Sequence, residues 1–121
     1  RAVAPTPQQQ AQEQIRRQVD QLKETFPGKI ILVTAPSGAF RCFGTDAMLV
    51  ARATGLKTDD TIEPCVLACQ AADAKAAMIR VAALHENAVV VRRETVPDGQ
   101  PSKFYATPIR EEVGMPATAA G

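Results

Sequence analysis

The segment that most restricts the possible folds of this chain is residues 26–56, FPGKIILVTAPSGAFRCFGTDAMLVARATGL. Its apolar, β-branched run at residues 30–35 predicts a strand, and the Pro-Ser-Gly sequence that follows has the residue types of a tight turn. A second strand is expected at residues 39–43, because so short a connection makes the two strands antiparallel neighbours. The apolar spacing then changes to a helical period over residues 46–54. This order of elements predicts an α/β fold.

The residues that flank the helical segments predict where each helix begins and ends. Thr45 or Asp46 is expected to cap the helix after the hairpin with a side-chain oxygen, and Gly55 is expected to end it in the left-handed conformation. An earlier helix should begin within the glutamine run and end at the Pro-Gly pair of residues 27–28. Its apolar residues are spaced by four, three and four positions and so share one helical face: Ile15, Val19, Leu22 and Phe26.

The second half of the chain predicts further strands and one more helix. A strand is expected at residues 61–68, and its proline predicts either a position at the edge of the sheet or a late start of the strand. Residues 88–91 form an apolar run that is typical of a strand buried on both faces, and a Pro-Asp-Gly turn leads to a last strand near residues 103–106. Between the strands at residues 61–68 and 88–91, an alanine-rich helix is predicted at residues 71–84. We predict that its sheet-facing residues are Ala72, Ala76, Ile79 and Ala83.

Together these elements predict one α/β domain, a mixed sheet flanked by about three helices, over residues 11–108. The 121 residues, of which 45% are hydrophobic, suffice for one core. Residues 1–10 are expected to be a flexible linker and residues 109–121 a flexible tail. The chain starts without methionine and ends in small residues, so we expect it to be a piece of a longer protein whose remaining domains are its partners. No apolar run approaches the roughly 20 residues that cross a bilayer, so we expect a cytoplasmic location and no membrane contact.

Two segments of the sequence are similar to a known DNA-reading module. The hairpin and helix of residues 26–56, with FGTDA at residues 43–47 and ATGL at residues 53–56, resemble the N-terminal mismatch-recognition domain of the DNA mismatch repair protein MutS. Residues 66–94 resemble a later strand, helix and strand of that domain. The two segments cover about half of the chain. The resemblance implies a similar mixed α/β fold and an association with DNA.

The resemblance also implies which residues would contact DNA. In the family, a phenylalanine and a glutamate two residues apart stack on and hydrogen-bond to a mispaired base, and here Ala39 and Arg41 occupy these places. An alignment shifted by one residue would place the ring of Phe40 there instead. Because arginine reverses the charge of the glutamate, the expected contact is with the DNA backbone and not with a mismatch. With the neighbouring cations included, the predicted DNA-binding residues are Lys29, Ala39, Phe40, Arg41, Arg92 and Arg93.

Two functions agree with these observations. The first is a non-catalytic accessory domain of a larger DNA-processing protein, such as a conjugation protein encoded by a plasmid or another mobile element. The second is a protein-interaction or spacer domain that binds no DNA. A net charge of +1 and an aromatic content of 4% leave this alternative open, because DNA-binding domains are usually more basic and single-strand binders use aromatic rings.

Signatures of enzymes and of metal sites are incomplete in this sequence. The turn after residue 34 lacks the lysine and the hydroxyl residue of a phosphate-binding loop. Cys42, Cys65, Cys69 and His85 have the residue types of a zinc site, but two cysteines four positions apart on a strand lie about 13 Å apart. We therefore expect no catalytic residue, no cofactor and no metal. The three cysteines are expected to remain free thiols, since their number is odd.

Overall fold

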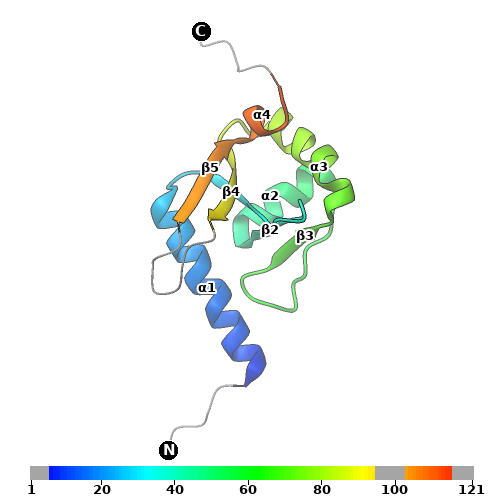
Figure 1. Ribbon diagram of the computed structural model, residues 1–121. Coiled ribbons are helices and arrows are strands. Elements are labelled where there is room, and N and C mark those ends of the chain that lie inside the picture. Colours follow the sequence, from blue (N-terminus) through cyan, green and yellow to red (C-terminus); the bar gives the residue numbers. More distant parts are fainter. Residues whose placement is uncertain (1–5, 95–102, 116–121) are drawn as a thin grey trace, which may run out of the picture.

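The computed structural model describes residues 6–94 and 103–115 (Figure 1). The elements in this part of the chain are, in order, α1 (Pro7–Thr25), β1 (Ile30–Thr34), β2 (Phe40–Phe43), α2 (Gly44–Thr54), β3 (Val66–Cys69), α3 (Ala71–Leu84), β4 (Ala88–Glu94), β5 (Lys103–Pro108) and α4 (Ile109–Glu112). The strands form one five-stranded mixed sheet in the order β3-β2-β1-β4-β5. The predicted α/β class is therefore confirmed, and the short α4 joins the three predicted helices.

Strand β1 lies at the centre of the sheet. It pairs antiparallel with β2 and parallel with β4, with Thr34 opposite Arg92. Strands β3 and β5 form the two edges, each antiparallel to its neighbour. Because β1 and β4 run in the same direction, their carboxyl ends lie at the same end of the sheet as the turn between β1 and β2. We call this end the hairpin end.

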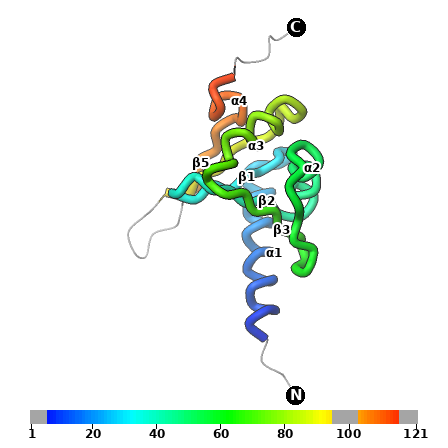
Figure 2. The backbone as a smooth tube through the Cα atoms, turned by 90° about the vertical axis from the view of Figure 1, so that its right-hand side faces the viewer, coloured from blue at the N-terminus to red at the C-terminus, as the bar shows by residue number. Residues whose placement is uncertain are grey.

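The helices cover the two faces of the sheet unequally, as Figure 2 shows. Helices α2, α3 and α4 pack on one face, over a core that includes Leu32, Phe40 and Val90. The C-terminal part of α1 packs on the other face, where Leu22 joins a smaller apolar cluster with strand residues such as Val91. The N-terminal turns of α1 project away from the sheet (Figure 1). The sheet therefore has one well-covered face and one that α1 covers in part.

Several predicted features are confirmed. Helix α3 has the predicted bounds, β3 lies at an edge of the sheet, and all four residues from Ala88 to Val91 are buried. Gly55 ends α2 with a φ of 79°, in the left-handed region that favours glycine. None of the described helices combines the length and the apolar character needed to cross a membrane.

The folded part extends beyond the predicted limits at both ends. Helix α1 begins at Pro7, within the predicted linker, because Thr6 and Gln9 form a capping box in which each side chain accepts from the backbone N–H of the other. Helix α4 lies in the predicted tail, and Ile109 is fully buried in the main core. The remaining residues of the linker and tail, and the predicted Pro-Asp-Gly turn, lie outside the described residues.

Two predicted details of the helices were wrong. The stripe of α3 predicted to face the sheet is exposed, and the buried stripe consists of Ala74, Ala77, Met78, Val81 and Ala82. Neither Thr45 nor Asp46 caps α2, since the N-cap residue is Phe43 and it provides no side-chain hydrogen bond. The carboxylate of Asp46 instead accepts hydrogen bonds from Lys23 and Ile31.

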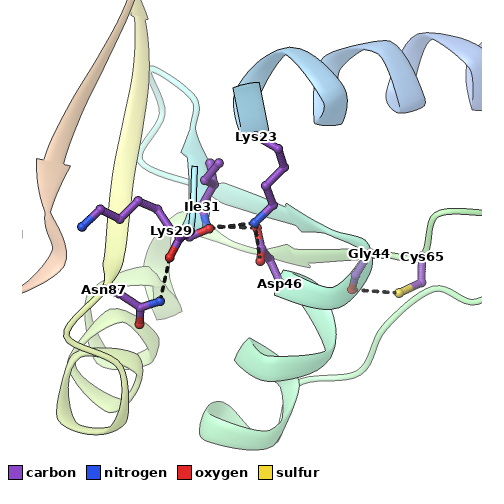
Figure 3. Close-up of polar contacts among 8 residues, drawn as sticks. Lys23, Lys29, Ile31, Gly44, Asp46, Cys65 and Asn87 are labelled. Atoms are coloured by element: carbon purple, nitrogen blue, oxygen red, sulfur yellow. Dashed lines mark hydrogen bonds and ion pairs between the residues drawn. The ribbon is translucent and has the colours of Figure 1, made fainter. Parts of the chain in front are cut away.

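Asp46 joins α1, β1 and α2 through one buried carboxylate (Figure 3). Its oxygens accept from Lys23 Nζ at 2.8 Å and from the backbone N–H of Ile31 at 3.1 Å. Lys23 also donates to the carbonyl of Lys29 at 2.7 Å. The pairs that join β1 to β2 are Val33–Arg41 and Thr34–Phe40, and at Ile31 the carboxylate of Asp46 is the acceptor of the backbone N–H. These contacts fix the end of α1 against the sheet.

Candidate nucleic-acid interface

A cleft of about 550 Å3 opens at the hairpin end of the sheet, on the face that α1 covers in part. Its floor contains small and apolar residues of the strands, among them Val33 and Ala68. Arg41 comes from β2 and Arg93 from β4, while Gln18 of α1 also lines the cleft. We call this surface the α1-face cleft.

The pairing of the strands places the two arginines on the same face. Val33 of β1 lies opposite Arg41 on one side and opposite Val91 on the other. Arg93 is two residues beyond Val91, and side chains alternate between faces along a strand, so Arg93 shares the face of Arg41. From the spacing of strands and residues, the two Cα atoms are about 12 Å apart. Two cations distant in the sequence are thus brought to one surface.

The positive charges of these arginines are available to a ligand. Both residues are exposed, and the guanidinium groups lie over phenylalanine rings, Arg41 6.0 Å from the centroid of Phe43 and Arg93 5.8 Å from that of Phe104. Among the described residues, neither arginine forms an ion pair, and no Asp or Glu lines the cleft. The site therefore has an unbalanced positive charge, with the arginine stems supported by aromatic rings.

Arg92 lies on the opposite face, in a second cleft of about 460 Å3 that Lys75 and Glu112 also line. It forms a two-pronged ion pair with Glu112 of α4. Hydrogen bonding to Glu112 raises the pKa of Arg92. Because its charge is already compensated, Arg92 is a weaker anion site than Arg41 or Arg93.

Three further residues were predicted to contact DNA, and they lie in three different environments: Lys29, Ala39 and Phe40. Lys29 lies just before β1, four residues from Val33 and therefore about 13 Å from the cleft along the strand. Ala39 is half-buried in the lining of the α1-face cleft. Phe40 borders that cleft, but it is only 1% exposed and belongs to the core under α2 and α3. Its ring is thus not placed to stack on a base, as the shifted alignment would require.

The cysteines and the histidine that resembled a zinc site are separated in the fold. Cys42 and Cys69 are buried on neighbouring strands, Cys65 donates to the carbonyl of Gly44 at 3.4 Å, and His85 caps the far end of α3. Within residues 6–94 and 103–115, no three Cys, His, Asp or Glu side chains come together as metal ligands. Burial raises the pKa of Cys42 well above its ordinary value, and the Asp46 carboxylate adds to the shift.

These positions predict unequal reactivity of the thiols. We expect a short treatment of the native protein with iodoacetamide to modify Cys65 and to leave Cys42 and Cys69 unmodified, because the thiolate is the reactive form and burial raises the pKa of both protected thiols. Mass spectrometry of peptides would measure this, with urea-unfolded protein as the control in which all three react. Modification of Cys42 as fast as Cys65 in native buffer would contradict it.

Sequence reasoning missed two side chains of the α1-face cleft, Gln18 and Gln70. Gln18 lies within the predicted first helix, and Gln70 lies between the strand predicted at residues 61–68 and the helix predicted at residues 71–84. In the described part of the chain, neither side-chain amide has a hydrogen-bond partner. No local pattern marks them, because they meet only when α1 and the edge strand pack against the same sheet.

The chemistry of the cleft is that of an anion site with additional polar groups. Each guanidinium offers five N–H donors and each amide offers both a donor and an acceptor, so the four side chains suit a phosphate or carboxylate group attached to a polar ligand. Comparison of the sequence with protein-family models and with curated proteins finds no match in either. The function must therefore be inferred from the site itself.

Proposed function

We propose that this chain is a non-catalytic, DNA-associated domain of a larger DNA-processing protein, and that the α1-face cleft binds the DNA backbone. The observation that carries the proposal is the convergence of Arg41 and Arg93 on a concave surface without acidic lining residues. The similarity of residues 26–56 and 66–94 to the mismatch-recognition domain of MutS supports DNA as the anion. A plasmid or another mobile element, with a conjugation protein as parent, is the proposed setting.

The proposed contact depends on charge and not on base identity. Arg41 stands where the family has a glutamate, and its guanidinium group would donate to phosphate oxygens. The ring of Phe40 is buried, and that of Phe43 is also buried beneath Arg41, so neither can wedge between bases. The domain is therefore expected to bind many sequences and to lack a preference for mismatches.

Replacing either arginine should weaken DNA binding. We expect Arg41→Ala and Arg93→Ala each to lower the affinity for a labelled oligonucleotide about tenfold, because each removes a charge-assisted contact with a phosphate. For single-stranded DNA, the slope of log K against log salt should become shallower by about 0.7 per arginine removed. Fluorescence anisotropy with single-stranded, duplex and mismatched DNA at several salt concentrations measures both quantities.

Two further variants test whether binding occurs at this cleft. Lys29→Ala and Arg80→Ala each remove one exposed positive charge, the first before β1 and the second on α3, across the sheet. Both should leave the affinity within about twofold of the unchanged protein, since neither lies in the cleft. Binding that does not depend on salt, or that Lys29→Ala weakens as much as Arg41→Ala, would refute the proposed site.

The alternative of a protein-interaction or spacer domain is supported by a different observation. Large apolar residues are exposed on the helices of the covered face: Met48 of α2 (52%), Ile79 (41%) and Leu84 (65%) of α3. Such residues can contact another domain of the parent protein. Absence of binding to any DNA form at high protein concentration, with the fold intact by circular dichroism, would favour this alternative.

A further inference from the structure

The α1-face cleft contains more than its two cations. Four of its side chains have polar groups with no hydrogen bond to a described residue: Arg41, Arg93, Gln18 and Gln70. The glutamines come from different elements, Gln18 from α1 and Gln70 from the residue after the edge strand β3. Charged donors and neutral amides thus line the same concavity.

We propose that this cleft takes a single strand of nucleic acid, with Arg41 and Arg93 on phosphates and Gln18 and Gln70 on the edges of unpaired bases. The inference rests on the proposed function and adds the form of the ligand. Glutamine amides match the donor and acceptor groups of base edges, with adenine as the best partner. A duplex offers base edges only from within its grooves, whereas a single strand exposes its Watson–Crick edges as well, so free amides inside a cleft are more readily reached by unpaired bases.

The position of the arginines also favours a flexible strand. They lie within a concavity whose lining includes residues of α1 and of β3, and not on the convex tip of the hairpin. Figure 2 shows α1 extending away from the same face of the sheet, and Gln18 of this helix lines the cleft. Duplex DNA is stiff over tens of nanometres and presents a convex backbone, whereas a single strand can follow a narrow cleft.

The mode of binding differs from that of single-strand binders that stack bases on aromatic rings. Phe40 and Phe43 are buried, and Phe104 is half-buried under Arg93. The exposed ring of Tyr105 lies opposite Arg92 and not in this cleft. The affinity should therefore come from phosphate contacts and amide hydrogen bonds. The two kinds of contact can be separated, because removing a cation changes the salt dependence and removing a neutral amide does not.

The test compares labelled 12-nucleotide oligomers of dA, dC and dT, a 12-base-pair duplex and an RNA oligomer of A, by fluorescence anisotropy with the full chain. We expect the single strands to bind at least tenfold more tightly than the duplex at low salt. Gln18→Ala and Gln70→Ala should each weaken single-strand binding about threefold to tenfold and reduce the differences between base types, with an unchanged salt slope. The matched control is Gln12→Ala on α1, which does not line the cleft.

The outcomes separate this inference from the proposed function. If the duplex binds as tightly as the single strand while Arg41→Ala still weakens both, the single-strand inference fails and backbone binding stands. If no oligomer shows salt-sensitive binding, both fail. Equal binding of RNA supports the single-strand inference without a preference for either sugar, whereas tighter binding of RNA supports it and identifies RNA, in place of DNA, as the source of the strand. If polyglutamate displaces the labelled oligomer at a lower concentration of charges than unlabelled oligomer does, the inference is overturned in favour of an acidic protein ligand.

Discussion

Asp46→Ala is expected to lower the free energy of unfolding by about 2–4 kcal/mol, more than the loss of any other polar contact described above. The side chain of Asp46 is 8% exposed and that of Lys23 is 39% exposed. Without the carboxylate, the ammonium of Lys23 can turn towards water, but the N–H of Ile31 remains buried and loses its acceptor. Urea denaturation followed by circular dichroism measures the change.

Further variants show whether the loss comes from the shared contact. Lys23→Met should also destabilise, because it leaves a buried carboxylate without its cation. The double variant Lys23→Met/Asp46→Ala should cost less than the sum of the two single changes, since the ion pair is lost only once. Asp20→Ala, which removes an exposed carboxylate from α1, should change stability by less than about 0.5 kcal/mol. A loss of stability in the double variant that equals the sum of the two single losses would contradict a direct interaction between the two side chains.

Asp46 also illustrates what the sequence can and cannot predict. A short acidic residue before a helical segment is typical of an N-cap, and the helix does begin nearby. The partners of its carboxylate, Lys23 and Ile31, lie on other elements, so their identity depends on how α1 packs. Local patterns therefore predict the helix, whereas tertiary packing decides the use of the side chain.

Helix α3 shows the same limit of prediction from sequence, here for the choice of its buried face. Its bounds could be predicted because a strand and a polar turn flank it. The stripe predicted to face the sheet and the stripe that is buried are both rich in alanine, however, and differ little in hydrophobicity. The sheet buries the stripe with Met78 and Val81, which fill more volume than the alanines that flank Ile79 on the exposed stripe. A sequence without clear amphipathic contrast does not determine this choice.

The candidate site could be predicted only in part. Arg41 could be named from the sequence, since it belongs to the predicted hairpin. The approach of Arg93 depends on the parallel pairing of β1 with β4, and the approach of Gln18 depends on where α1 packs. Long-range pairing of this kind has no local signal. The side of the hairpin that faces the core is equally uncertain, because a shift of one residue exchanges the two faces of a strand.

Phe40→Ala is expected to have the largest effect of all, a loss of about 3–5 kcal/mol in the free energy of unfolding. The ring is 1% exposed and belongs to the main core under α2 and α3. Strand β2 is paired on both sides, with β1 and with β3, so the backbone around the missing ring cannot easily move in to fill the cavity. Chemical denaturation measures the loss, and Phe40→Leu, which leaves a smaller cavity, should cost clearly less.

The same variant separates a structural role of Phe40 from a DNA contact. At temperatures where Phe40→Ala remains folded, its affinity for DNA should match that of the unchanged protein, because the ring lies on the face opposite to Arg41. Arg41→Ala should show the reverse, with weakened binding and stability nearly unchanged, since its side chain is exposed. A selective loss of DNA affinity in Phe40→Ala, at unchanged stability, would instead make Phe40 the ring that stacks on a base and would place the DNA surface on the other side of the hairpin.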